Sequence, residues 1–471
     1  MEGIDRFLLA ISSLAIGIIG LLFLKQAVSL HWRRLTLATL IWYTYFFFLF
    51  IPSIWIAVYE EPPEGYRTLA LVLSAAITIP IGVLGANAVW RFRRQEITRF
   101  YYTSIEPCDF SERKALFILT ILALLLSGFF FIEIKTIPIL YAFTHPGEPH
   151  TFTLLRQYAT KELSSPFRYP YFMLRQFGWS LIISCWFGIT WLNRNNKRKW
   201  FFFLSLLGIA LFYNIAVLAK HPPLILLGSL GITYYLYRGG RIKIMILGLL
   251  VGLACAIPFS IILLYTPQIP INSIWNATAK RSFYVPARMN FYYIHIYQNK
   301  QEFLWGRSIG KLANIVNLFD PSYEYVSSSE DTYRFLFPNS PYKGSANTSF
   351  IGTAYANWGI FGPPIYGLVI GLISQSLQIW LIRQKKTIFL IGVQSGLFIS
   401  FAHLIITDLF TVMFSGGGLV LPLILALGRV KWRFPSAPLR VQLQKSAECE
   451  KTTPTCSSQQ IETLAKYPHG C

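Results

Sequence analysis

Basic side chains gather between residues 267 and 348, a stretch that lies between long apolar segments. It carries eight cations: Lys280, Arg281, Arg288, Lys300, Arg307, Lys311, Arg334 and Lys343. A guanidinium group binds two phosphate oxygens at once, so the arginines suit an anionic ligand. The pattern predicts binding of an anion such as a lipid-linked diphosphate, whose developing charge the cations would stabilise during group transfer.

Four residues are the first candidates for such a cationic site: Arg281, Arg288, Arg156 and Lys220. Each also has a purely structural interpretation, as a lipid-headgroup contact, a solvated charge or a helix cap. Transfer to a hydroxyl group further requires a base that accepts the hydroxyl proton. The candidates for the base are His221, His295, Glu133, Glu162, Asp331 and Asp408. The sequence leaves the choice among them open.

Amide and aromatic side chains near the same cations could recognise a sugar. Asn347 and Asn357 can exchange hydrogen bonds with glycan hydroxyls, and the rings of Tyr292, Tyr355 and Trp358 can stack on sugar faces. Tyrosine and tryptophan are also enriched where membrane proteins meet the lipid headgroups. An interfacial aromatic belt is therefore the alternative for most of these rings.

The composition predicts a membrane protein. The chain has 471 residues, of which 54% are hydrophobic and only 13% are charged, whereas a soluble domain is about 25% charged. The net charge of +21 is carried mostly by short loops between apolar runs. It therefore reports membrane topology, and nucleic acid is not expected as a partner.

About eleven apolar runs are long enough to cross a bilayer, which requires roughly 20 residues in a helix. They predict an all-α, polytopic integral membrane protein with a large external loop before the ninth helix. The expected spans cover residues 7–27, 36–59, 68–90, 115–137, 171–192, 200–219, 221–237, 242–265, 358–382, 387–409 and 415–429.

The loops between these spans alternate in charge. Cytoplasmic loops of membrane proteins carry an excess of lysine and arginine. Basic residues cluster at 25–34, 91–114, 194–199, 238–243, 383–386 and 429–433. The other loops are acidic, short or mixed, beginning with the run from Glu60 to Glu64. The alternation predicts an external N-terminus and a cytoplasmic C-terminus.

Two external segments are longer than a turn, at about 138–170 and 267–348. Apolar residues at helical spacing predict a short helix in the membrane interface within the first segment. In the second, Arg288, Tyr292 and His295 recur near the helical period and are expected to share a face. Residues 321–345 are rich in serine, proline, tyrosine and acidic residues, which predicts an irregular loop.

The chain is expected to form one membrane domain over residues 1–434. The polar stretch 435–471 is expected to be a disordered cytoplasmic tail. The six cysteines lie outside the predicted external loops, so no disulfide framework is expected. The sequence contains no tightly spaced zinc ligands, phosphate-binding glycine loop or nucleotide fingerprint, and neither a metal nor another cofactor is expected.

Two segments at the borders of the long external stretch resemble the oligosaccharide repeat-unit polymerases, the O-antigen polymerase (Wzy-type) family. They are residues 279–288 (AKRSFYVPAR) and 347–362 (NTSFIGTAYANWGIFG). The resemblance is clearest from about 280 to 375. Elsewhere it is limited to hydropathy and loop lengths. It implies an all-helical fold in a bacterial inner (plasma) membrane, with functional arginines in two external loops.

The resemblance also implies an activity, namely transfer of a growing glycan from polyprenyl diphosphate onto the next lipid-linked repeat unit. The expected partners are polyprenyl-diphosphate-linked oligosaccharide, membrane lipid, a chain-length regulator and a flippase. The alternatives are an O-antigen ligase, another multi-spanning lipid-dependent glycosyltransferase that uses acidic residues such as Glu60 and Glu61, a transporter of lipid-linked sugars, and a membrane scaffold.

Overall fold

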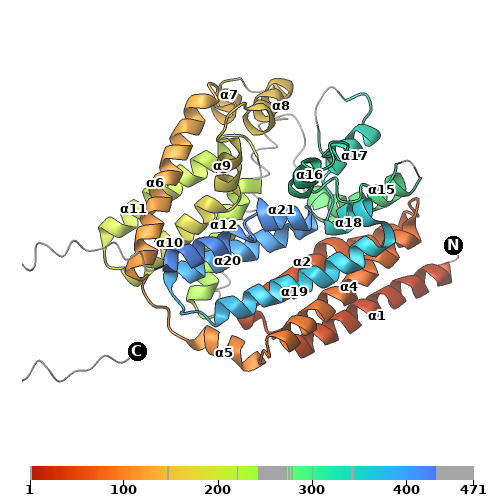
Figure 1. Cartoon of the computed structure of the whole chain (residues 1–471), viewed down its shortest axis with the longest axis horizontal. Helices are drawn as coiled ribbons and strands as arrows, with labels where there is room; N and C mark the ends of the chain where they lie inside the picture. Colours follow the sequence, from red (N-terminus) through yellow and green to blue (C-terminus); the bar gives the residue numbers. More distant parts are fainter. Residues whose placement is uncertain are drawn as a thin grey trace, which may run out of the picture. The chain divides into compact units, whose positions relative to one another are not determined.

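The described part of the chain is helical. The computed structural model describes residues 3–145, 148–219, 221–241, 279–299, 301–340 and 344–430, together with residues 273 and 276. These residues form helices and one isolated bridge between Glu106 and Thr387, with no β-strand among them (Figure 1). The expected all-α fold is therefore confirmed. Lys220, the expected span 242–265 and the expected tail 435–471 lie outside the described residues.

The helices follow one another along the chain with short connections. In order they are α1 (Gly3–Ala27), α2 (Leu37–Tyr45), η2 (Phe46–Phe50), α3 (Ile51–Tyr59), α4 (Gly65–Val89), α5 (Arg94–Tyr102), α6 (Phe110–Glu133), α7 (Pro138–Thr144), α8 (Pro149–Gln157), η3 (Tyr158–Glu162), α9 (Arg168–Met173), η4 (Leu174–Gly178), α10 (Trp179–Leu192), α11 (Lys197–Ile215), α12 (His221–Tyr237), η5 (Lys280–Tyr284), α15 (Val285–Asn299), α16 (Gly310–Asn317), α17 (Ser328–Leu336), α18 (Phe350–Trp358), α19 (Gly362–Ile382), α20 (Ile388–Ala402), α21 (Leu409–Phe414) and α22 (Val420–Arg429). The turns η2, η3, η4 and η5 are π-helical.

Eight helical stretches among the described residues are long and apolar enough to cross a membrane. They are Ile4–Ala27, Leu37–Tyr59, Gly65–Val89, Phe110–Glu133, Arg168–Leu192, Lys197–Ile215, Phe350–Ile382 and Ile388–Ile405. Each overlaps one of the spans expected from the sequence. The chain thus has the build of a multi-pass membrane protein.

Two of the other expected spans correspond to shorter helices. Helix α12 has 17 residues, and α22 has 10, which gives α22 a length of only about 15 Å at 1.5 Å per residue. The expected span 415–429 therefore starts as a loop. Gly417 in that loop has a φ of +97°, a left-handed backbone conformation that favours glycine.

The stretch Phe350–Ile382 consists of two helices rather than one. Helix α18 ends at Trp358 and is followed by the cap residue Gly359, whose φ is +59°. At Gly362, where α19 begins, a β-carbon would lie 2.1 Å from the carbonyl oxygen of Ala354, so only glycine fits this turn. Residues 350–357 are all buried, and α18 packs between α15 and α19. With 21 residues, α19 alone is long enough to cross a membrane, and α18 belongs to the packed segment before it.

Part of the long segment before the ninth expected span is folded into the helical core. In α15, Phe291, Tyr293, Ile294 and Tyr297 are at most 2% exposed. The expectation of an irregular loop over residues 321–345 was wrong for residues 328–336, which form α17. The hydroxyl of Ser327 caps this helix by accepting a hydrogen bond from the Glu330 N–H, and acidic residues in its first turn favour the helix dipole. These local signals override the polar composition.

The buried apolar residues form two main clusters. The larger joins α1 to α4 with α15, α18, α19 and α20. The smaller is centred on α6, α10 and α11 and includes Phe130, Tyr171, Trp179 and Tyr213. Helix α10 contacts α20 and α12 as well as α11 and α6, so it links the two clusters.

Several loops that the sequence assigns to one side of the membrane lie together at one end of the bundle, here called the basic end. The hydroxyl of Tyr101 donates to the carbonyl oxygen of Leu35 at 2.6 Å. Arg383 forms an ion pair with Glu96 at 2.8 Å. The loop Glu60–Glu64 instead meets α15 at the opposite end, where Asn299 Nδ2 donates to Glu64 Oε1 at 3.3 Å. This segregation agrees with the alternation of loop charges.

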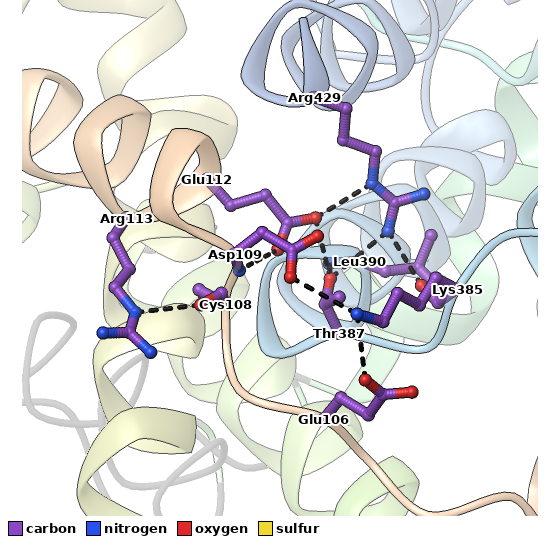
Figure 2. A network of polar contacts seen from close by, with 9 residues as sticks. All are labelled: Glu106, Cys108, Asp109, Glu112, Arg113, Lys385, Thr387, Leu390 and Arg429. Carbon is purple, nitrogen blue, oxygen red and sulfur yellow. Dashed lines mark hydrogen bonds and ion pairs between the residues drawn. The ribbon is translucent and has the colours of Figure 1, made fainter. Parts of the chain in front are cut away.

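A buried ion pair holds the basic end together. Glu112 at the start of α6 is fully buried, and Arg429 at the end of α22 lies 2.9 Å away (Figure 2). The Glu112 carboxylate also accepts from the hydroxyl of Thr387 at 2.9 Å. Arg429 donates to the carbonyl oxygen of Lys385 at 2.8 Å, and the Lys385 ammonium pairs with Glu106 at 2.9 Å. Three distant chain segments are thereby fixed to one another.

We expect Glu112→Gln to lower the free energy of unfolding by about 3 kcal/mol. The expected loss lies at the lower end of the range for breaking buried ion pairs, because the Arg429 side chain is 21% exposed to solvent. Thermal unfolding of the purified protein in detergent measures the effect. The exposed ion pair made by Lys385 provides the control, and Lys385→Gln should have little effect. Equal losses from both substitutions would contradict the assignment.

Candidate functional site

Segment 279–288 ends in α15 and segment 347–362 contains α18, and these two helices pack together through Asn290. The Asn290 side chain is fully buried. Its Oδ1 accepts hydrogen bonds from the hydroxyls of Thr348 and Ser349, both at 2.8 Å, and from the N–H of Gly352 at 3.1 Å. One amide oxygen therefore fixes the first turn of α18 on α15. Sequence analysis did not single out this residue.

A small polar cavity of about 90 Å³ opens beside this contact. Its lining comes from α15, from the loop before α16, from the start of α17, from the approach to α18 and from the connection between α20 and α21. The lining residues are Tyr293, Ser308, Tyr325, Ser327, Ser328, Ser329, Asn347, Thr348, Thr353, Ile406, Thr407, Asp408 and Thr411. Hydroxyl groups dominate the list. The volume suffices for about three water molecules and is well below that of a typical ligand pocket.

Asp408 is the only carboxylate in the lining of this cavity. Its Oδ2 caps α21 by accepting from the N–H of Phe410 at 2.9 Å and of Thr411 at 3.4 Å. Its Oδ1 is buried and forms no hydrogen bond of normal geometry among the described residues, and the Thr353 side chain lies beside the carboxylate. Burial raises the pKa of Asp408, which lies beyond the span that ends at Ile405. A fixed carboxylate with one unused oxygen is suited to accept a proton from a hydroxyl group.

A second polar group surrounds Arg288 on the opposite side of α15 from Asn290. Arg288 pairs with Glu60 at 3.3 Å, its Nε donates to the hydroxyl of Tyr292 at 3.1 Å, and its guanidinium lies 5.3 Å from the ring centre of Tyr284. The hydroxyl of Tyr284 donates to Glu60 at 2.5 Å. Burial, followed by the hydrogen bond to Glu60, raises the pKa of Tyr284 to about 12. The charge of Arg288 is therefore largely neutralised within the protein.

The π-helical turn η5 precedes α15 and carries Lys280 and Arg281. The ammonium of Lys280 lies 5.3 Å from the ring centre of Tyr284. Arg281 is exposed and has no ion-pair partner within the described part of the chain. A π-helical turn is rare and frequently marks a functional site. Among the described residues at the start of α15, Arg281 is thus an exposed cation that is available to a ligand.

The remaining site candidates on α15 and α18 are engaged in internal contacts. His295 Nδ1 lies 3.2 Å from Asn299 Nδ2. The same Nδ2 donates to Glu64 Oε1. Asn357 is fully buried, and its Nδ2 donates to the carbonyl oxygen of Thr353 at 2.7 Å. Its Oδ1 accepts from the N–H of Gly306 at 3.1 Å. These contacts position the loop before α16 and leave the Asn357 amide no free hydrogen-bonding group for a glycan.

The structure separates the predicted aromatic residues into two groups. Tyr292 belongs to the group around Arg288, whereas Tyr355 and Trp358 contact the loop after α15. Tyr355 meets the ring of Phe303 edge-on at 5.6 Å, and Trp358 meets Trp305 at 6.2 Å. Asn347 is exposed and lines the cavity with Asp408. Of the five predicted sugar-binding residues, Asn347 is thus the one in the cavity lining.

Two predicted residues lie elsewhere, and one cannot be placed. Arg156 is exposed on α8, in the segment 138–170 that the sequence predicts to be external. His221 at the start of α12 is partly buried, and its Nε2 lies 2.8 Å from His403 Nε2. Lys220 is outside the described residues. Neither Arg156 nor His221 lines the cavity of Asp408.

Comparison with known proteins does not extend this assignment. No protein-family model, no curated protein and no solved structure matches the chain significantly.

We expect Asn290→Ala to lower the free energy of unfolding by about 2 kcal/mol or more. The substitution leaves three buried donors without an acceptor, and each unsatisfied group costs roughly 1–3 kcal/mol. Chemical denaturation or thermal unfolding in detergent measures the loss. Asn347→Ala, at an exposed position on the same segment, serves as the control and should unfold like the wild type. An unchanged Asn290→Ala protein would show that this contact does not hold α18.

Proposed function

We propose that the chain is a membrane glycosyltransferase that polymerises polyprenyl-diphosphate-linked oligosaccharide repeat units. The observation that carries the proposal is the packing of α15, the helix in which the segment 279–288 ends, against α18 of the segment 347–362, beside one polar cavity that contains Asp408. The cavity supplies hydroxyl groups and a carboxylate oxygen that forms no hydrogen bond of normal geometry among the described residues. The cations at the start of α15 supply positive charge at the same end of the bundle. The reaction needs both kinds of group.

In the proposed reaction, Arg281 binds the diphosphate of the donor lipid. Its guanidinium is exposed, whereas Arg288 is already paired with Glu60. Arg288 instead holds Tyr284 and Tyr292 in place, which fixes the turn that presents Arg281. Glu60 is committed to these contacts, which weakens the alternative in which acidic residues of the Glu60–Glu64 loop act in catalysis.

In the proposed reaction, the bonds formed and the bonds broken balance without a cofactor. A hydroxyl of the acceptor sugar attacks the anomeric carbon of the donor glycan and gives its proton to Asp408. The bond between that carbon and the diphosphate oxygen breaks, and its electrons remain on the leaving polyprenyl diphosphate. Arg281 stabilises this developing charge. The raised pKa of Asp408 makes its ionised form a stronger base.

The reaction requires a defined orientation. We assign the N-terminus and the end of the bundle with Asp408 to the outside of a bacterial plasma membrane, and the C-terminus to the cytoplasm. The clustering of basic loops around Glu112 and Arg429 supports this assignment, because basic loops accumulate in the cytoplasm. A flippase would deliver the lipid-linked units to this side, and a chain-length regulator would act on the growing polymer.

Single-cysteine labelling tests the orientation. In a cysteine-free background, we expect Ser345→Cys to react with a membrane-impermeant maleimide in intact cells. Asn195→Cys, in the basic loop between α10 and α11, should react only after the cells are permeabilised. Both positions are exposed, so access to the reagent depends on the side of the membrane. The reverse labelling pattern would rule out the proposed mechanism.

The lipid-linked glycans of a deletion strain test the activity. Strains that carry Arg281→Ala or Asp408→Asn should accumulate single repeat units at normal protein levels and lose at least about 90% of the long polymer, the tenfold or greater effect of losing a catalytic group. Asparagine caps a helix about as well as aspartate, so Asp408→Asn removes the base while preserving α21. Arg334→Ala, at an exposed arginine of α17, is the matched control for Arg281→Ala.

The lipid-linked glycans of the deletion strain also distinguish a polymerase from a ligase, a transporter or a scaffold. Long polymer that remains on the polyprenyl carrier in the deletion strain would indicate a ligase. A profile unchanged by the deletion would indicate a transporter or a scaffold. Full polymer synthesis by both variants would place the leaving-group site and the base at other residues.

A further inference from the structure

Arg175 is a buried cation within a membrane-spanning segment. It lies on the π-helical turn η4, inside the apolar stretch Arg168–Leu192. Seven residues separate it from Arg168, which corresponds to a depth of about 10 Å along the helix. Only 7% of Arg175 is exposed. Charged residues at such positions are energetically costly and usually functional.

The surroundings of Arg175 do not neutralise its charge. Its guanidinium lies 4.7 Å from the ring centre of Phe130 and 5.6 Å from that of Tyr213. The guanidinium also interacts with the hydroxyl of Tyr213, whereas its Nε has no hydrogen-bond partner among the described residues. No carboxylate among the described residues forms an ion pair with it. The segment 242–272, which is not described, contains neither aspartate nor glutamate.

Another buried polar group of the same cluster also lacks a partner. The Trp179 indole N–H, four residues from Arg175, has no hydrogen-bond partner within the described chain. Glu133 lies at the end of α6, one turn beyond Phe130. One oxygen of Glu133 accepts from the hydroxyl of Ser165 at 2.9 Å, and the Tyr171 hydroxyl lies beside the same carboxylate. Unsatisfied polar groups are rare in protein interiors and call for an explanation.

We propose that Arg175 binds the phosphate group of a lipid. A guanidinium group recognises phosphate oxygens through paired hydrogen bonds, and a bound phosphate would supply the missing counter-charge. The neighbouring helices favour a lipid over a soluble anion, because only 28% of the apolar window of α6 and of α11 is buried within the protein. Phe129, Ile132 and Phe212 on these helices are exposed, where lipid chains can contact them.

The site does not depend on the proposed glycosyl transfer. A membrane phospholipid and a polyprenyl diphosphate carry the same recognised group. With a phospholipid, the site would anchor α6, α10 and α11 in the bilayer. With a polyprenyl diphosphate, it would hold a carrier lipid beside α6, α10 and α11. The apolar cluster of these helices does not include Asp408.

Native mass spectrometry of the purified full-length protein in detergent tests the proposal. The probes are phosphatidylglycerol, polyprenyl diphosphate, inorganic diphosphate and, as the phosphate-free control, diacylglycerol. We expect Arg175→Gln to weaken binding of the phosphate-bearing lipids at least about tenfold, the scale on which lost charge-assisted contacts act. Arg168→Gln removes an exposed arginine two turns earlier on the same helix and should bind like the wild type.

The relative affinities identify the source of the phosphate. Preferential, Arg175-dependent binding of polyprenyl diphosphate would assign the site to a carrier lipid, and equal binding of phosphatidylglycerol would assign it to a structural lipid. Binding of diacylglycerol equal to that of the phosphate-bearing lipids would overturn the proposal. Undiminished binding by a folded Arg175→Gln protein would overturn it as well.

Glu133→Gln provides a second test that remains informative if Arg175→Gln does not fold. Removal of the negative charge of Glu133, which lies on the same helix as Phe130, should strengthen binding of phosphate-bearing lipids, because it reduces repulsion of the anion. If Arg175 serves only as a structural partner of Glu133, this variant should lose stability and bind the lipids as the wild type does. Because binding is measured without turnover, the outcome is independent of glycan synthesis.

Discussion

The pairing of charges at the ends of apolar helices is the constraint on which this structure depends. An isolated charge is costly in an apolar environment, so the ionised groups near the helix ends meet across loops that are distant in sequence. Glu112 and Arg429 lie 317 residues apart and form one such pair. Arg288 and Glu60 form another at the opposite end. These pairs fix which helix ends can be neighbours and thereby orient the bundle.

Small polar side chains then shape the end that carries the candidate site. Asn290 and Asn357 are both fully buried, and each uses its amide to hold backbone from another segment. Because their hydrogen bonds are internally satisfied, they stabilise the approach of α18 to α15 without competing for a ligand. The cavity beside them contains the groups with unused capacity, including Oδ1 of Asp408. Structural and chemical roles are thus divided between neighbouring polar residues.

Two arginines of interest share a local feature, because each lies on a π-helical turn. Arg281 lies on η5 and Arg175 on η4. A π-helical turn inserts one residue into a helix and shifts the faces that follow it. Within η4, Phe177 lies against Gly417, whereas Arg175 lies against Phe130 of α6 and Tyr213 of α11. Such turns are tolerated where tertiary contacts offset their less favourable hydrogen-bond geometry.

Hydropathy and charge are summed over many residues, so the amino-acid sequence was enough to predict the membrane class, the helical fold and the loops that share an end. It was also enough to single out Asp408, Arg281 and Arg288 as chemically capable groups. The partners of these groups became known from the folded structure. In the folded chain, Arg288 pairs with Glu60, whereas Arg281 is exposed. The amide of Asn357 is fully used in hydrogen bonds within the protein. Arg175 is buried between Phe130 and Tyr213. The physical reason is that availability for a ligand depends on contacts between residues far apart in sequence, which local patterns do not encode.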